Sequence, residues 1–103
     1  MSLFKSVRSL TATLLTTPTG AAVAPNTIIG QVNVIYTDSA PGANVIAIQA
    51  LLNDGVTWAT IFTVSTTKAS DLISLNGPYM DIRAAVTSHT VSGTITVDVF
   101  VSG

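Results

Sequence analysis

Hydrophobic and polar residues alternate with a period of two along much of this chain of 103 residues. The clearest stretch is residues 94–101, where Ile or Val occupies every second position and Thr or Asp most of the positions between them. Successive side chains of a strand point to opposite faces, so this pattern predicts a strand with one buried face. Similar alternation predicts further strands at residues 27–37, 57–64 and 79–87.

Other apolar stretches predict strands with less regular faces. Residues 9–17 are rich in β-branched Thr, residues 71–75 are short, and residues 21–24 suit a short edge strand or an isolated bridge. Residues 44–52 are apolar on both faces apart from Gln49. Such a strand is expected either at the centre of a sandwich or beneath another subunit.

Turn residues separate these strands. Asn53-Asp54-Gly55 predicts a tight hairpin turn, because Asn, Asp and Gly tolerate left-handed backbone angles. Pro41-Gly42 matches the central pair of a type II turn, and Asn76-Gly77-Pro78 predicts another reversal. The chain is therefore expected to be all-β, an antiparallel β-sandwich of the jelly-roll or immunoglobulin-like type with about six to eight strands.

Three single residues are given a place in this predicted fold. Trp58, the only Trp, follows the hairpin turn and is expected to supply the largest single piece of the core, with its ring capping one end of the sandwich. Arg83 lies on the polar face of its predicted strand, which allows a cross-strand ion pair, for instance with Asp98. Gly30, in the middle of a strand, predicts a bulge or a close backbone approach.

Residues 1–8 are interpreted as an N-terminal arm, and residues 9–103 as one β-sandwich domain. The apolar residues of the arm are spaced so that either one short amphipathic turn or an extended segment is allowed. An ordered arm is most easily explained by docking onto a neighbouring molecule. The residues expected to contact that neighbour are Leu3, Phe4, Lys5, Val7 and Arg8.

Composition adds that the surface carries very little charge. Apolar residues make up 48% of the chain and charged residues only 9%, and there is no Glu. Ordinary domains contain about a quarter of charged residues, and a weakly charged surface is poorly protected against association. A small, mildly sticky monomer is one explanation. We expect instead that the surface is largely covered by further copies of the chain or by a larger assembly.

Charge and residue content also exclude several classes of protein. The formal net charge of −1 provides no electrostatic footprint for nucleic acid. The absence of Cys excludes disulfides, thiolate metal sites and a catalytic thiol. No apolar run approaches the roughly 18 residues that a membrane-spanning helix needs. We therefore expect neither nucleic acid nor a membrane as a partner.

No motif for catalysis or metal binding stands out. His89, the only His, lies in a predicted turn and is interpreted as a solvated residue. The Asp residues are scattered, whereas a calcium loop needs several oxygen ligands at fixed spacing. No Ser lies in a Gly-x-Ser-x-Gly context, and no Lys follows a glycine turn as in a phosphate loop. We therefore expect no enzymatic activity, no cofactor and no metal.

Three aromatic residues, Tyr36, Trp58 and Tyr79, are candidates for a ligand platform, because exposed rings stack on the faces of sugars. Packing in the core and at its rim is the favoured interpretation of the same residues. For Trp58 the pattern leaves open whether the ring only closes the core or also faces a partner.

Three short motifs occur in order along the chain, each at a predicted turn or strand entry. They are Asn53-Asp54-Gly55-x-Thr57-Trp58, Asn76-Gly77-Pro78-Tyr79-x-x-Ile82-Arg83-Ala84 and Ser92-Gly93-Thr94-Ile95-Thr96-Val97. Together they resemble small β-sandwich virion proteins of tailed bacteriophages, which occur as capsid decoration proteins, head fibres or tail components. The resemblance covers residues 9–101 and departs at Leu52, where these proteins usually have Ser.

The resemblance implies a non-enzymatic structural protein of a phage virion, acting as a capsid decoration or attachment subunit. Its partners are then expected to be copies of itself, with a trimer favoured, and other virion proteins such as the major capsid protein. Its expected location is the virion, and the host cytoplasm during assembly. The alternative is a carbohydrate- or receptor-binding module at a fibre or tail tip, and a third class is a bacterial surface or pilus-like domain.

Overall fold

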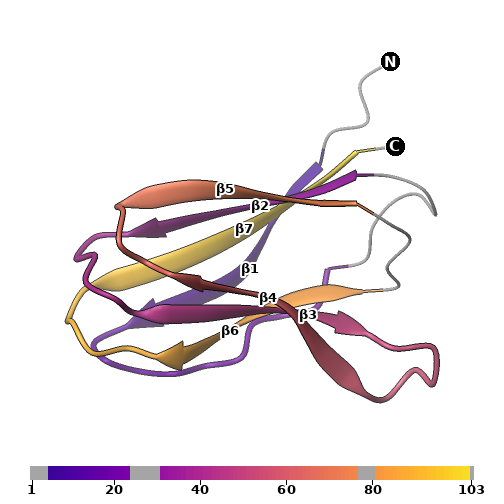
Figure 1. Cartoon of the computed structure of the whole chain (residues 1–103), viewed down its shortest axis with the longest axis horizontal. Coiled ribbons are helices and arrows are strands. Elements are labelled where there is room, and N and C mark those ends of the chain that lie inside the picture. The colour runs from indigo at the N-terminus through magenta and orange to yellow at the C-terminus, as the bar shows by residue number, and fades with distance from the viewer. Residues whose placement is uncertain (1–4, 24–30, 77–80, 103) are drawn as a thin grey trace.

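Seven strands account for most of the residues that the computed structural model describes, which are residues 5–23, 31–76 and 81–102 (Figure 1). In chain order they are β1 (Lys5–Thr13), β2 (Gln31–Asp38), β3 (Val45–Leu51), β4 (Trp58–Ser65), β5 (Ser70–Asn76), β6 (Ile82–Ser88) and β7 (Thr94–Ser102). All pairings between them are antiparallel. Within those three ranges no helix is long and apolar enough to cross a membrane.

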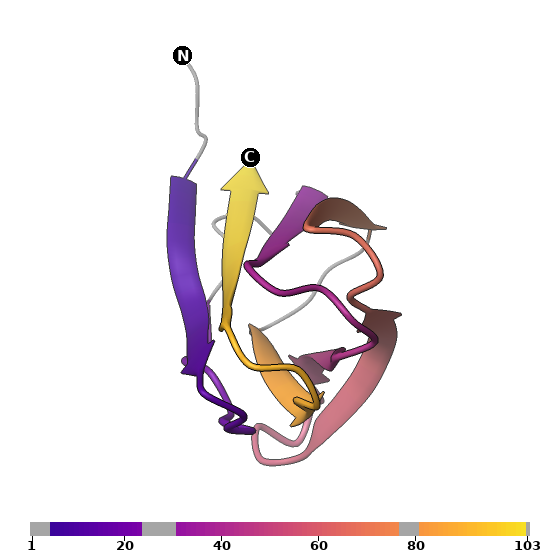
Figure 2. The same cartoon turned by 90° about the vertical axis from the view of Figure 1, so that its left-hand side faces the viewer.

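The strands form two sheets that pack on each other (Figure 2). The four-stranded sheet has the order β1-β7-β2-β5, and the three-stranded sheet has the order β4-β3-β6. This arrangement confirms the predicted antiparallel β-sandwich. β3, whose sequence is apolar on both faces, is the central strand of its sheet, and its Ala47 is only 4% exposed.

The core between the sheets consists of the inward residues that the alternation predicts. Each fully buried Val or Ile contributes about 1.5–3 kcal/mol relative to an exposed one. The Val and Ile side chains with the least exposure are Val32, Val34, Ile46, Ile48, Ile82, Val86, Ile95, Val97 and Val99. The inward faces predicted for β2, β6 and β7 are therefore confirmed.

The chain that follows β1 closes one side of the sandwich by running between β1 and β6. Ser9, at a register shift in β1, donates its hydroxyl to the Ala21 carbonyl oxygen at 2.8 Å, and the Ser9 carbonyl oxygen accepts the Ala21 N–H at 2.7 Å. On the other flank, Val23 and Ile82 exchange two backbone hydrogen bonds. Gly20 passes so close to β1 that a Cβ there would lie 2.2 Å from the Ser9 carbonyl oxygen. The bridge predicted in this region is confirmed.

The N-terminal strand begins earlier and ends earlier than predicted. Lys5 lies opposite Val101 of β7, so the predicted boundary between an arm and a domain after residue 8 is wrong. The backbone hydrogen bonds of this ladder hold residues 5–8 inside the domain. The strand ends at Thr13 because Leu14 and Leu15 take left-handed φ angles of 55° and 63°.

The turn after β2 differs from the predicted type II turn. The left-handed residue is Ala43, with a φ of 66°, and not Gly42. A Cβ at Gly42 would lie 2.7 Å from Val91 Cγ2, so a larger residue there would displace the Val91 side chain. The bulge predicted at Gly30 lies outside the described residues.

Candidate binding surface

The β3–β4 hairpin has a turn whose polar groups are satisfied locally. The Asp54 carboxylate accepts hydrogen bonds from the backbone N–H groups of Val56 and Thr57 at 2.9 and 2.8 Å, and from the Thr57 hydroxyl at 2.5 Å. The Thr57 hydroxyl, followed by the two N–H groups, lowers the pKa of Asp54 from its ordinary value. Gly55 takes a φ of 73°, as such a turn requires. The predicted hairpin turn is confirmed.

Trp58 begins β4 and lies beside an ordered arginine. The guanidinium carbon of Arg83 is 4.2 Å from the centroid of the Trp58 ring, which is a cation–π distance. Arg83 Nε donates to Gln49 Oε1 at 2.7 Å, and Gln49 Nε2 donates to Thr60 Oγ1 at 3.4 Å. The strand register brings these side chains together, because Gln49 lies opposite both Arg83 of β6 and Thr60 of β4.

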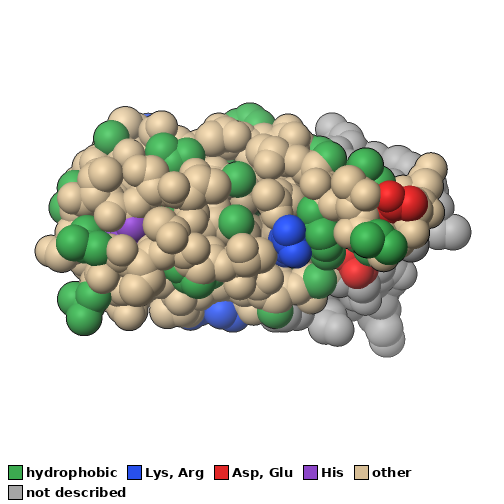
Figure 3. All heavy atoms as spheres, turned by 90° about the horizontal axis from the view of Figure 1, so that it is seen from below, with side chains coloured by type: hydrophobic (Ala, Val, Ile, Leu, Met, Phe, Trp, Pro, Cys, Tyr) green, Lys and Arg blue, Asp and Glu red, His purple; other side chains and the backbone are tan. Residues whose placement is uncertain are grey.

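Exposed apolar side chains also lie in the turn of this hairpin. Leu52 is 44% exposed and Val56 is 77% exposed. Figure 3 shows a basic side chain in the middle of one side of the molecule, hydrophobic side chains beside it and acidic side chains toward one end. We refer to the following six residues as the hairpin face: Gln49, Leu52, Val56, Trp58, Thr60 and Arg83. A surface that combines a cation, an aromatic ring, apolar groups and polar groups is typical of protein–protein interfaces.

Trp58 is not part of the core, so the prediction that it supplies the largest piece of core is wrong. The register between β3 and β4 shifts between Ile48 and Gln49, which gives β4 one extra residue. Ile61 and Val64 pack against the core cluster, and Trp58 does not belong to it. The ring lies instead under Arg83 on the outer face of the three-stranded sheet.

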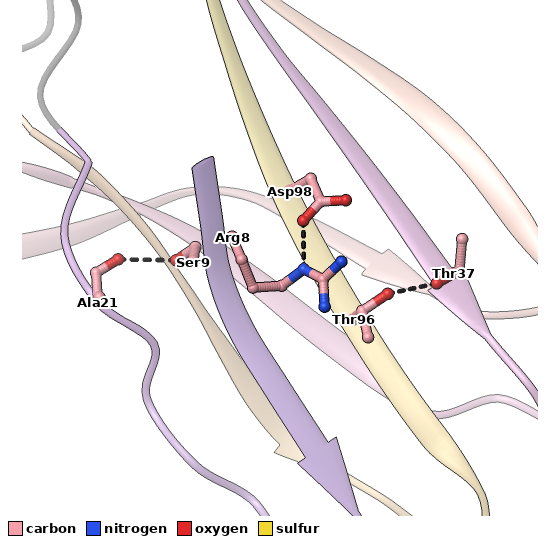
Figure 4. A network of polar contacts seen from close by, with 6 residues as sticks. All are labelled: Arg8, Ser9, Ala21, Thr37, Thr96 and Asp98. Carbon is pink, nitrogen blue, oxygen red and sulfur yellow. Dashed lines mark hydrogen bonds and ion pairs between the residues drawn. The ribbon is translucent and has the colours of Figure 1, made fainter. Parts of the chain in front are cut away.

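The ion pair considered for Arg83 and Asp98 does not form, because the two residues lie in different sheets. Asp98 of β7 accepts a hydrogen bond from Nε of Arg8, directly opposite it in β1 (Figure 4). On the same strand the hydroxyl of Thr96 is hydrogen-bonded to that of Thr37 in β2. These contacts tie the polar side of the four-stranded sheet together.

The predicted aromatic platform is not assembled. Tyr36 is 1% exposed, and its hydroxyl donates to the Lys68 carbonyl oxygen at 3.3 Å. Burial is the main cause that raises the pKa of Tyr36. The prediction for Tyr36 is therefore wrong, because its position in β2 faces the core. Tyr79 lies outside the described residues, which leaves Trp58 as the one predicted platform residue placed on the hairpin face.

The residues predicted to contact a partner through the arm are described only in part. Leu3 and Phe4 lie outside the described residues, and only the backbone of Lys5 and Val7 is described, as part of β1. Arg8 has a side chain that is 52% exposed but is paired with Asp98. A role of this segment in binding a partner stays a prediction.

A buried polar cluster was missed by the sequence analysis. Asp38 Oδ2 accepts hydrogen bonds from Asn44 Nδ2 at 2.9 Å and Thr66 Oγ1 at 2.6 Å, and Oδ1 accepts the Ala40 N–H at 3.0 Å. Asp38 is 2% exposed, and Asn44 and Thr66 are 0% exposed. Burial is the largest influence and raises the pKa of Asp38, but the three hydrogen bonds, with nearby His89, outweigh it and lower the pKa overall. The only signal in the sequence was an Asp at the start of a turn.

His89 is 7% exposed, so its interpretation as a solvated turn residue is wrong. Its Nδ1 lies 3.1 Å from the carbonyl oxygen of Thr16, in the loop that follows β1. Nε2 is buried and has no hydrogen-bond partner among the described residues. In the part of the chain that the structure describes, no three His, Asp or Glu side chains gather where they could hold a metal ion.

Comparison with known proteins gives a match in fold but no family. No family model matches the chain, and no curated protein matches it. The crystal structure of the SPBc2 prophage-derived protein YomS is similar, with a TM-score of 0.67 and 16% identity over 100% of this chain and 96% of that one. A structure from work on disulfide-linked pili of Bacillus endospore appendages aligns with a TM-score of 0.46 and 13% identity, over 99% of this chain and 90% of that one. The first likeness shows a shared fold.

Proposed function

We propose that this chain is a non-enzymatic structural protein of a phage particle, acting as a decoration or attachment subunit. It assembles with copies of itself, with a trimer favoured, and binds other virion proteins such as the major capsid protein. The hairpin face is one of the surfaces that make these contacts. The protein is then located in the virion, and in the host cytoplasm during assembly.

The observation that carries this proposal is the fold shared with a prophage-derived protein. The alignment has a TM-score of 0.67 and covers 100% of this chain and 96% of that one, so the common architecture extends over nearly all of both chains. The ordered motifs at residues 53–58, 76–84 and 92–97 add the resemblance to small β-sandwich virion proteins of tailed bacteriophages.

The surface supports a role in assembly. Only 9% of the residues are charged, and exposed apolar side chains lie in the turn of the hairpin that carries Trp58. Apolar groups rimmed by polar ones mark protein contacts, and Trp and Arg are among the residues that dominate the energy of such contacts. This chemistry suits contacts of small area that are repeated many times in one particle.

Particles purified from a host that carries the gene test the proposal. We expect the protein in those particles at a fixed ratio to the major capsid or tail protein, measured by quantitative mass spectrometry. The double variant Leu52→Ser with Val56→Ser should fold but be incorporated several-fold less. Leu72→Ser is the matched control, because Leu72 is 55% exposed in β5 of the other sheet. Absence of the protein from particles would refute the proposal, and equal loss in both variants would exclude the hairpin face.

Native mass spectrometry of the purified protein tests self-assembly, where a monomer at micromolar concentration would count against it. Deleting residues 1–4 tests the arm, because β1 begins at Lys5 and every described strand stays intact. We expect the deleted protein to fold and to be incorporated less well. Unchanged incorporation would remove the arm from the proposal.

A second candidate function is the binding of a carbohydrate or receptor. It is favoured by the place of Trp58 on the hairpin face next to the amide of Gln49 and the hydroxyl of Thr60. An aromatic ring with a few polar groups is a common arrangement in ligand sites. Binding on a glycan array that is lost in Trp58→Ala, with an unchanged circular dichroism spectrum, would support this function. Absence of any bound glycan would refute the carbohydrate version.

A further inference from the structure

Within the described residues, neutral groups hold the Arg83 side chain in place. Its guanidinium carbon lies 4.2 Å from the centroid of the Trp58 ring, and its Nε donates to Gln49 Oε1 at 2.7 Å. A guanidinium has five N–H donors, and among the described residues Nη1 and Nη2 have no hydrogen-bond partner. These two nitrogens form a planar fork whose position is set by the ring and by the amide.

Other described cations already have acidic partners. Arg8 is paired with Asp98, and Lys68 Nζ lies 3.8 Å from Asp71 Oδ2. Within the described part of the chain Arg83 has no carboxylate at ion-pair distance, although Asp81 precedes it by two positions. Arg83 is also half-buried. A partly buried cation without a counter-ion is costly, and a carboxylate from another molecule would offset that cost.

We propose that Arg83 is the recognition element of a carboxylate-binding site on the hairpin face. The fork of Nη1 and Nη2 receives an Asp or Glu side chain of a partner protein, and the Trp58 ring contacts an apolar residue that flanks it. Gln49 is a positioning residue, because it acts by fixing the Arg83 guanidinium. This inference rests on the proposed role of the hairpin face as a protein contact and adds the chemistry of recognition.

The surroundings favour a single carboxylate over a phosphate group. Arg83 is the only Lys or Arg in the three strands of its sheet, and a phosphate dianion is usually bound by several cations or backbone N–H groups. Asp81, two positions before Arg83, would repel a second negative charge. A carboxylate carries a single negative charge, and its two oxygens can accept two parallel N–H···O hydrogen bonds from the guanidinium.

The same surroundings favour an acidic residue of a protein over a sugar acid. Arg83 already covers one face of the Trp58 ring, so that face cannot stack on a sugar. Leu52 and Val56, exposed in the turn of the same hairpin, have apolar side chains without the polar groups that sugar hydroxyls need. An acidic side chain between apolar side chains complements this surface best.

Fluorescence gives a direct test, because Trp58 is the only Trp of the chain and lies against Arg83. The probe is the blocked peptide acetyl-Leu-Asp-Leu-amide, and the matched neutral probe is acetyl-Leu-Asn-Leu-amide, both titrated at constant ionic strength. We expect a saturable change in Trp58 emission with the acidic peptide. The neutral peptide should bind at least about tenfold more weakly, since it loses a charge-assisted hydrogen-bonded pair.

Variants assign the effect to the fork of Arg83. Arg83→Met keeps an apolar stem over the ring and should abolish binding of the acidic peptide, and Arg83→Lys should weaken it because the ammonium has no planar fork. Gln49→Leu should weaken it several-fold while the guanidinium remains. Arg8→Met is the control, because it removes a cation from the other sheet and should leave binding unchanged. Circular dichroism checks folding. If Arg83→Met does not fold, the loss of peptide affinity in Gln49→Leu is used as the test.

Several outcomes would overturn the inference. These are equal binding of the two peptides, unchanged binding by Arg83→Met, tighter binding of inorganic phosphate than of the acidic peptide, or tighter binding of N-acetylneuraminic acid. The titration uses the isolated protein and no particles. Its failure would leave the proposed place in the virion untouched, and absence of the protein from particles would leave a measured carboxylate affinity untouched.

Discussion

Removing the Asp38 carboxylate is expected to destabilise the protein strongly, although no part of the hairpin face is touched. Asp38→Ala leaves the donors of Asn44 and Thr66, both 0% exposed, without an acceptor. It also removes the acceptor of the Ala40 N–H at 3.0 Å. The substitution therefore breaks the buried polar cluster that links the β2–β3 turn to the loop after β4.

The magnitude follows from the number of groups left unpaired. A buried donor without a partner costs about 1–3 kcal/mol, so two such donors cost about 2–6 kcal/mol. The free energy recovered by no longer burying a charge reduces this somewhat, and we expect a loss of about 3–5 kcal/mol. Domains of this size are stable by about 5–15 kcal/mol, so the midpoint of thermal unfolding should fall by about 12 °C or more.

Urea unfolding followed by far-ultraviolet circular dichroism measures this loss. Asp98→Ala is the matched control, since it removes the same side chain from a partly exposed ion pair and should cost about 0–1 kcal/mol. Thr66→Val removes one donor and keeps the volume, so about 1–2 kcal/mol is expected for it. If Asp38→Ala and Asp98→Ala lose equal stability, the reasoning about buried donors is refuted.

The same carboxylate should give the protein an acid-sensitive step. Hydrogen bonds lower the pKa of Asp38 in the folded state, although burial, the largest single influence, opposes them. A group with a lowered pKa stabilises the fold above its unfolded pKa, about 3.9 for Asp, and this contribution is lost as the pH falls through the folded pKa. Below about pH 4 the wild type should therefore lose stability more steeply than Asp38→Asn. Parallel pH profiles of the two proteins would contradict the assignment.

Two further predictions concern the backbone. Gly20→Ala should lower the free energy of unfolding by at least about 2–3 kcal/mol or prevent folding, because the new Cβ would lie 2.2 Å from the Ser9 carbonyl oxygen. Gly55→Ala should lower it by only about 1 kcal/mol, because Gly55 has a left-handed φ of 73° but a Cβ there would meet no atom within 4 Å. Thermal unfolding separates the two, and a larger loss for Gly55→Ala would contradict the packing argument. Replacing Leu14 by Asn and Leu15 by Gly should raise stability by about 1–3 kcal/mol, because both residues hold left-handed φ angles. Urea unfolding checks this, and a loss of stability would mean that the two Leu side chains serve the fold.

Much of the fold could be read from local patterns. The alternation of Ile95, Val97 and Val99 with polar residues predicted the inward face of β7, and all three are fully buried. The Asn53-Asp54-Gly55 turn was predicted from residues that tolerate left-handed backbone angles, and Gly55 has a φ of 73°. Both features depend on the geometry of a few consecutive residues, so no knowledge of distant partners was needed.

The hairpin face could be predicted only in part. Trp58 was recognised as a candidate for ligand contact, but it was also expected to dominate the core. One extra residue in β4 decides between the two, because the register shift beside Ile48 sends Ile61 and Val64 to the core and leaves Trp58 under Arg83. A bulge of one residue has no clear signature in the sequence.

The local sequence thus determined the strands, the turns and most of the inward faces, because the face to which a side chain points follows from the backbone around it. It did not determine which partners the polar groups have, or that Asp38 and His89 are buried. Arg8 and Asp98 are 90 residues apart in sequence and become neighbours only because β1 pairs with β7. Which strands pair depends on how the whole core packs, so only the folded chain could reveal these contacts and the place of the Arg83 guanidinium over the Trp58 ring.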